Sequence, residues 1–127
     1  MIRVHLITFF IYQFSSALTA QEAISQFDHF TTNAGLSQST VTCIYQDYQG
    51  FMWFGTYDGL NRFDAYNFNI YRYNQEDSTS ISHNFIWTIF EDSANNLWIG
   101  TREGLNLYDR ANDTFINFNN SDKTVFS

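Results

Sequence analysis

The sequence predicts an all-β chain with about two four-stranded antiparallel sheets, and two observations lead to this fold class. The first is a repeat, because residues 51–64 read FMWFGTYDGLNRFD and residues 96–109 read NLWIGTREGLNLYD. The second is composition, because aromatic residues make up 20% of the chain and charged residues only 15%. A chain with so many rings buries them in a folded core and is not a disordered tail.

The repeat has a period of 45 residues and extends beyond the two quoted segments. The same offset pairs Asn74 with Asn119, and we expect it to hold without a gap through both units. The shared motif is Asp47, Trp53, Gly55, Thr56, Gly59, Leu60, Asn61 and Asp64, repeated as Asp92, Trp98, Gly100, Thr101, Gly104, Leu105, Asn106 and Asp109. Such regularity indicates duplicated structural units, here 36–80 and 81–125, with a truncated third unit starting at 126–127.

Each unit is predicted to contain four short strands separated by turns. In the first unit, VTCIYQD alternates between two faces and DYQG reads as a turn. There, Asp47 accepts a bond from the backbone two residues on, and Gly50 takes positive φ. We expect strands at 41–47, 51–56, 60–64 and 68–73, and again at 86–92, 97–101, 105–109 and 114–118.

Two positions of the motif lie inside a strand and have a predicted packing role. Gly55 and Gly100 sit in strand interiors, where glycine costs stability, so we expect another backbone or a large ring to approach them. Trp53 and Trp98 come two residues earlier and therefore share a strand face with these glycines. We expect each tryptophan to fill the wedge between its own sheet and a neighbouring sheet.

The turns of each unit follow from residues that favour them. Gly59 and Gly104 are predicted to adopt positive φ between the second and third strands. Asp64 and Asp109 are predicted to stabilise the turn that follows. Four short strands with turn signals, repeated at this spacing, are typical of β-propeller blades, in which each sheet covers a face of its neighbour. The expected fold is therefore a pair of blades from a larger, incomplete propeller.

Residues 47–64 resemble a two-component regulator propeller repeat, on the string Asp-x-x-Gly-x-Met-Trp-Phe-Gly-Thr-x-Asp-Gly-Leu-Asn-x-Phe-Asp. Residues 92–109 resemble it again, with asparagine replacing the first glycine and glutamate replacing an aspartate. The string FDHFTTNAGL at 27–36, which overlaps the lead-in 21–35, resembles the usual opening of such sensor domains. The resemblance implies that 27–30 forms the last strand of a blade that distant chain completes.

Members of this family are mostly the extracytoplasmic sensors of hybrid two-component systems. The resemblance therefore implies that the chain is the N-terminal fragment of a periplasmic propeller that senses oligosaccharides. Its implied partners are the remaining blades, a kinase region and, in the complete protein, a second copy in a homodimer. Two alternatives stay open, an exported binding or adhesion module without a kinase, and a propeller enzyme that acts on glycans. A membrane helix and a kinase downstream would favour the sensor.

Residues 1–20 are predicted to be a secretory signal peptide, with Arg3 before an apolar stretch and small residues leading to Ala20. The alternative is a buried first helix or strand. No second apolar run is long enough to span a bilayer, so we expect no membrane segment in the mature fragment. The net charge of −7, with scattered cations, argues against nucleic acid or an anionic membrane as partner.

No catalytic set stands out in the sequence, and we expect no enzyme activity, cofactor or metal for this chain. There is no G-x-S-x-G elbow and no glycine-rich phosphate loop. The EDSANN segment at 91–96 is interpreted as a turn because it lacks the spaced acids of a calcium loop. His29 and His83 are interpreted as ordinary polar residues. Cys43, the single cysteine, aligns with Thr88 and is interpreted as a small core residue.

Ligands of propellers bind at one end of the ring, over the central channel. The segments expected there are the links 37–40 and 82–85 and the turns at 57–58 and 102–103, where the two copies differ. The candidate ligand-binding residues are Trp87, Arg102, Tyr57, Asn84 and His83. An aromatic face over a sugar ring, with polar groups around it, suits carbohydrate recognition. The alternative is that Trp87 merely fills the core between the sheets.

Overall fold

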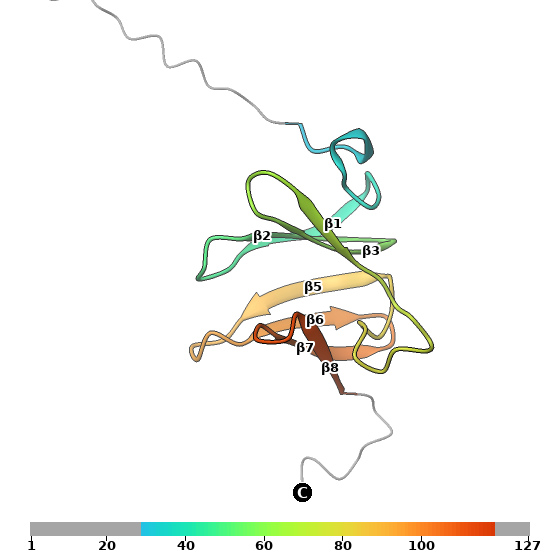
Figure 1. The fold of residues 1–127 in the computed structure, drawn as a ribbon, viewed down its shortest axis with the longest axis vertical. Helices are drawn as coiled ribbons and strands as arrows, with labels where there is room; N and C mark the ends of the chain where they lie inside the picture. The colour runs from blue at the N-terminus through green and yellow to red at the C-terminus, as the bar shows by residue number, and fades with distance from the viewer. Residues whose placement is uncertain (1–28, 119–127) are drawn as a thin grey trace, which may run out of the picture.

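The computed structural model describes residues 29–118, which form two four-stranded antiparallel sheets lying one above the other (Figure 1). The predicted signal peptide and the start of a third repeat lie outside the described residues. Strand order within each sheet follows the chain, so every neighbouring pair is joined by a local hairpin. The all-β, blade-like fold class is confirmed.

The first sheet, blade 1, contains β1 (Val41–Gln46), β2 (Met52–Thr56), β3 (Gly59–Phe63) and β4 (Phe68–Tyr71). The second sheet, blade 2, contains β5 (Ile86–Glu91), β6 (Leu97–Thr101), β7 (Gly104–Asp109) and β8 (Thr114–Phe118). A short 3-10 helix, η1 (Thr32–Ala34), precedes blade 1. Each observed strand lies within two residues of its predicted ends, because the turn residues bound the strands so closely.

The main core lies between the two blades. Trp53 is fully buried, and its ring stacks on Tyr71 at 5.8 Å and meets Tyr108 of blade 2 edge-on at 4.9 Å. Ile86 and Ile89 of β5 pack into the same cluster. Trp53 therefore fills the wedge between the sheets, as predicted. Burying such rings contributes about 1.5–3 kcal/mol for each large side chain.

The side chains that leave room only for glycine inside the second strand of each blade differ from those expected. A Cβ on Gly55 would lie 2.5 Å from Sγ of Cys43 and 2.7 Å from Cγ2 of Ile86. A Cβ on Gly100 would lie 2.8 Å from Cγ2 of Thr88. The expectation of an approaching backbone or ring is wrong, because the close group is an aliphatic or thiol side chain. The cross-strand neighbour occupies the space, and in blade 1 the next blade does so as well.

The turn residues act as predicted. Gly59 and Gly104 have φ of 124° and 143°. The Asp64 carboxylate accepts the backbone N–H groups of Tyr66 and Asn67 at 2.9 and 2.7 Å, and Asp109 accepts the equivalent groups of its own turn. These contacts join residues two or three positions apart, so the local sequence suffices to place them.

The gap-free 45-residue register is wrong beyond the turn between the third and fourth strands. Leu60 pairs with Tyr71 in blade 1, whereas the equivalent Leu105 pairs with Phe118 in blade 2, so the structural counterparts are 47 residues apart. In blade 1 the backbone of Asp64 bonds that of Asn67, leaving a two-residue turn. In blade 2 four residues, 110–113, separate the paired Asp109 and Thr114. The longer turn brings two charged side chains, Arg110 and Asp113, to blade 1.

The described end of the lead-in packs on the outer face of blade 1. The Phe30 ring lies 4.8–5.6 Å from the rings of Phe54, Phe63 and Phe68. Residues 29–30 are in no strand, and 27–28 lie outside the described residues, so the strand predicted over 27–30 is not observed in its described half.

Candidate functional site

One end of the two blades brings together most of the predicted ligand-binding residues. It is built from the β2–β3 turn of blade 1, the link between β4 and β5, and the β6–β7 turn of blade 2. Two backbone bonds join these segments: N–H of Gly59 donates to the carbonyl of Asn84 at 2.7 Å, and N–H of Arg102 donates to the carbonyl of Phe85 at 3.1 Å. We call the surface formed by Tyr57, Phe85, Trp87 and Arg102 the aromatic end.

The three rings of the aromatic end form a continuous row. Phe85 lies between the others, with its centroid 4.6 Å from that of Tyr57 and 4.6 Å from that of Trp87. Tyr57 is 48% exposed and Trp87 is 59% exposed, which is unusual for side chains this large in a small domain. A ligand with an apolar face finds a ready surface here.

A β-bulge directs Trp87 out of the core. The pairing of β5 with β6 shifts between Ile86, opposite Thr101, and Thr88, opposite Gly100, so that Trp87 is the extra residue. Bulges re-aim the side chain of the extra residue and are frequent at functional sites. The interpretation of Trp87 as a core filler is therefore wrong for the described part of the chain.

Arg102 stands apart from the other described arginines. Arg62, Arg72 and Arg110 each form an ion pair with a carboxylate. Within residues 29–118 the Arg102 guanidinium makes no ion pair or hydrogen bond, and the residue is exposed. It begins the turn directly after Thr101, whose partner across the ladder is the residue before Trp87. The guanidinium donors of Arg102 are thus exposed beside the aromatic row.

Asn84 and His83 hold the link in place. The side-chain oxygen of Asn84 accepts the N–H of Tyr73 at 2.7 Å, and Nδ1 of His83 accepts the N–H of Phe85 at 2.9 Å. Phe85, the central ring of the row, lies in the link 82–85 that was expected at this end but was not among the predicted ligand-binding residues. Its alignment with Thr40 in a segment where the copies differ is the signal that points to it.

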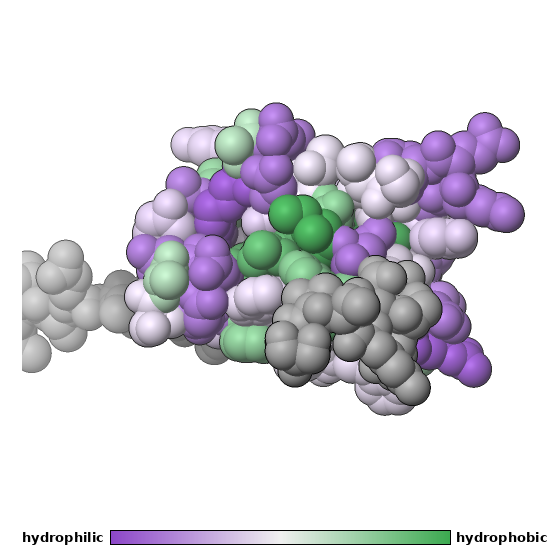
Figure 2. All heavy atoms as spheres, turned by 90° about the horizontal axis from the view of Figure 1, so that it is seen from below, coloured by the Kyte–Doolittle hydropathy of each residue, from purple (hydrophilic) through white to green (hydrophobic). Residues whose placement is uncertain are grey.

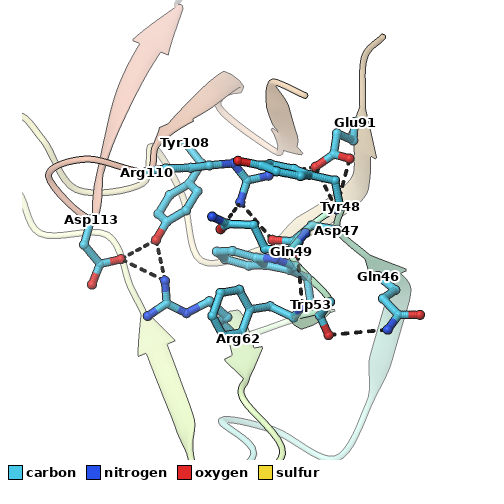
Figure 3. Close-up of polar contacts among 12 residues, drawn as sticks. Gln46, Asp47, Tyr48, Gln49, Trp53, Arg62, Glu91, Tyr108, Arg110 and Asp113 are labelled. Carbon is cyan, nitrogen blue, oxygen red and sulfur yellow. Dashed lines mark hydrogen bonds and ion pairs between the residues drawn. The ribbon is translucent and has the colours of Figure 1, made fainter. Parts of the chain in front are cut away.

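The opposite end of the blades holds a polar cluster that we call the latch (Figure 3). Arg110 of blade 2 donates to Asp47 of blade 1 at 2.9 Å and to Glu91 at 2.7 Å, and Asp47 also accepts the indole N–H of Trp53 at 2.9 Å. Burial acts to raise the pKa of Asp47. The bonds from Arg110, Trp53 and the backbone outweigh burial and lower that pKa.

A second half of the latch joins the outer strands. Arg62 of blade 1 donates to the hydroxyl of Tyr108 at 2.5 Å, and Tyr108 donates to Asp113 at 2.6 Å (Figure 3). Tyr71 also donates to Asp113, at 2.7 Å. Burial, followed by the bond to Asp113, raises the pKa of Tyr108 to about 12. These hydroxyls stay protonated at neutral pH and serve as donors across the blade contact.

A shallow pocket of about 190 Å³ lies at the rim beside the latch, between the outer strands β4 and β8. Tyr71, Asp113 and Phe115 line it together with four residues of the link, Asp77, Thr79, Ser80 and Ile81. Tyr71 and Asp113 are already bonded to each other, so the pocket belongs to the blade contact. In the described part of the chain no three metal-ligating side chains gather, and no helix is long and apolar enough to cross a membrane.

Comparison with known proteins shows what the two repeats are similar to. The family described as a two component regulator propeller matches residues 35–58 and 80–103, which carry the link and first two strands of each blade. A histidine kinase of Formosa agariphila is 56% identical over 66 residues. That match covers 52% of this chain and 5% of the kinase.

The chain is also similar to solved structures of extracellular domains. Two crystal structures of the extracellular domain of one B. thetaiotaomicron protein, called a one component system with the first and a hybrid two component system with the second, share 36% and 34% identity with the chain. Their TM-scores are 0.55 and 0.56, and each match covers 62% of this chain and 11% of the other. The chain thus spans about a tenth or less of its relatives. Two stretches of it, residues 35–58 and 80–103, are similar to the two component regulator propeller family.

Proposed function

We propose that the chain is part of the periplasmic, ligand-sensing propeller of a hybrid two-component sensor, and that the ligand is an oligosaccharide. The similarity to a histidine kinase and to extracellular domains of a hybrid two component system supports the sensor role. The observation that carries the ligand class is the exposed row of Tyr57, Phe85 and Trp87 at the aromatic end.

Recognition at this end would combine two kinds of contact. The flat ring of Trp87 would stack on the apolar face of a sugar, while the guanidinium of Arg102, which has no partner among residues 29–118, would donate to sugar oxygens. The framework beneath is rigid, because the backbone bonds from Gly59 to Asn84 and from Arg102 to Phe85 tie the link to both blades. In the complete sensor the remaining blades would close the ring, and the kinase region, in a homodimer, would transmit the signal.

The test is a double substitution, Trp87→Ala with Arg102→Ala, in the complete sensor. Cells with a transcription reporter receive a panel of neutral and acidic oligosaccharides, and the response of the variant is compared with that of the unmodified sensor. We expect the response to be lost at unchanged protein level, because neither side chain supports the fold. The control is Tyr66→Ala, which removes a ring that is 88% exposed but lies on the β3–β4 turn, away from the aromatic end. An unchanged response of the double variant would refute the proposed site.

A further inference from the structure

Each blade has two faces of different chemistry. The blades pack with the tryptophan face of one against the isoleucine face of the other. The tryptophan face of blade 1 carries Trp53, Leu60, Arg62 and Tyr71. The isoleucine face of blade 2 carries Ile86, Ile89, Ile99 and Tyr108 and packs against it. Two faces take no part in this contact. They are the tryptophan face of blade 2 and the isoleucine face of blade 1, and Phe30 packs on the latter.

The tryptophan face of blade 2 is apolar, and no sheet of the described residues covers it. Trp98 is half-buried and lies beside the rings of Phe90 and Phe118 at 6.4 and 5.7 Å. Leu105, Phe90 and Ile116 are 37%, 44% and 49% exposed. Figure 2, which views the molecule from the side of blade 2, shows hydrophobic residues at the centre of the surface with hydrophilic residues around them. In blade 1 the equivalent surface is the core of the molecule, so a partner sheet is expected here too.

This open face lacks the polar groups that make the latch on blade 1. Leu107 stands where blade 1 has Arg62, and Phe118 stands where blade 1 has Tyr71. A sheet that brought an aspartate and a tyrosine hydroxyl here, as blade 2 does to blade 1, would bury them without partners. Burying an unpaired polar group is costly, so such a sheet would dock poorly.

The remaining carboxylate of the open face already has its partners. Asp92 accepts the indole N–H of Trp98 at 3.0 Å and the side-chain amide of Asn96 at 3.0 Å. In blade 1 the second of these bonds comes from Arg110 of the neighbouring blade. Asn96 therefore supplies from within the blade what the latch supplies from outside, and a docking sheet needs no arginine at this place.

We propose that the tryptophan face of blade 2 docks a further blade whose isoleucine face is uncharged at the latch positions. Blade 1 itself shows this chemistry, with Gln46, Phe63 and Ala65 where blade 2 has Glu91, Tyr108 and Arg110. The presence or absence of latch residues on a blade thus determines which blade can pack against it. Blade 1 selects a charged neighbour, and blade 2 selects an uncharged one, so that blades assemble in one order.

The test adds a third blade to the full chain and asks whether it covers Trp98. Two fusions are compared, one with a second copy of residues 36–80 after Ser127 and one with a second copy of residues 81–125. Docking is read as protection of Trp98 from hydroxyl-radical oxidation, quantified by mass spectrometry of the peptide that holds it. We expect a several-fold slower oxidation in the fusion with the blade 1 copy, and a rate near that of the unfused chain with the blade 2 copy.

A reciprocal substitution separates a charge code from a mere difference in folding of the added blade. Leu107→Arg restores the missing cation, so it should protect Trp98 in the fusion with the blade 2 copy and reduce protection in the fusion with the blade 1 copy. Equal protection by both copies, protection by neither, or no reversal by Leu107→Arg would each overturn the proposal.

Discussion

Trp53 and Trp98 occupy the same place in the two blades, yet their surroundings differ. Each indole N–H donates to the aspartate six residues earlier, at 2.9 and 3.0 Å. Trp53 is fully buried beneath blade 2, whereas Trp98 is half-buried on an open face. The motif therefore determines local geometry, and the neighbouring sheet decides how much that geometry contributes to stability.

The greatest loss of stability is expected from replacing the tryptophan of blade 1. Trp53→Ala should lower the free energy of unfolding by about 3–5 kcal/mol, because it leaves a cavity in the core between the blades. Trp98→Ala should cost clearly less, because solvent already reaches that ring. Urea titration followed by circular dichroism measures both. Equal losses would mean that the open face is covered in solution.

The next effect concerns the latch. Arg110→Ala removes the cation beside Asp47, whose side chain is fully buried, and should cost about 3 kcal/mol of unfolding free energy. The matched control is Arg72→Ala, which breaks an ion pair with Asp58 in which both side chains are about half exposed and should cost under about 1 kcal/mol. Thermal unfolding of both variants measures the difference. Similar costs would show that the latch is no stronger than a surface pair.

A smaller difference is expected at the strand glycines. Gly55→Ala pushes a methyl group against both Cys43 and Ile86 of the next blade, and overpacking of this kind costs about 1–3 kcal/mol. Gly100→Ala meets only Thr88 of its own blade and should cost less. Denaturant midpoints of the two variants give the comparison. A greater loss at Gly100 would contradict the role given to the blade contact.

The smallest effect is the dependence of stability on acid. The folded-state pKa of Asp47 is lowered, and that of Asp92 is lowered to about 2 by the bonds from Trp98 and Asn96. A carboxyl with a lowered folded-state pKa contributes stability that is present above its ordinary pKa of 3.8 and is lost as pH falls through the folded value. Unfolding free energy should therefore decline between about pH 4 and pH 2.

Two variants separate the contributions of Asp47 and Asp92 to this loss of stability in acid, which we call the acid limb. Asp47→Asn and Asp92→Asn should each flatten it, and only Asp47→Asn should also remove the benefit of Arg110. The measurement is a series of urea titrations at fixed ionic strength across the acid range. A limb that stays as steep in both variants would assign the loss to other carboxylates.

The strands, the hairpin turns and the roles of Gly59, Asp64 and their repeats could all be predicted from the local sequence. These features rest on backbone preferences and on bonds between residues two to four positions apart, which a local pattern encodes fully. The predicted ligand residues Tyr57, Trp87 and Arg102 also lie at one end of the blades, because strand period and turn position place them there.

The contacts across the blades could not be predicted from the sequence, because they depend on how the two sheets pack. Arg110 and Asp47 are 63 residues apart, and their contact depends on a β7–β8 turn that is longer than its repeat. The same holds for the exposure of Trp87 at a bulge and for Phe85 between two other rings. Such contacts depend on how two sheets stack and on a two-residue shift in pairing. A sequence repeat with one constant period predicts neither the stacking of the sheets nor the shift.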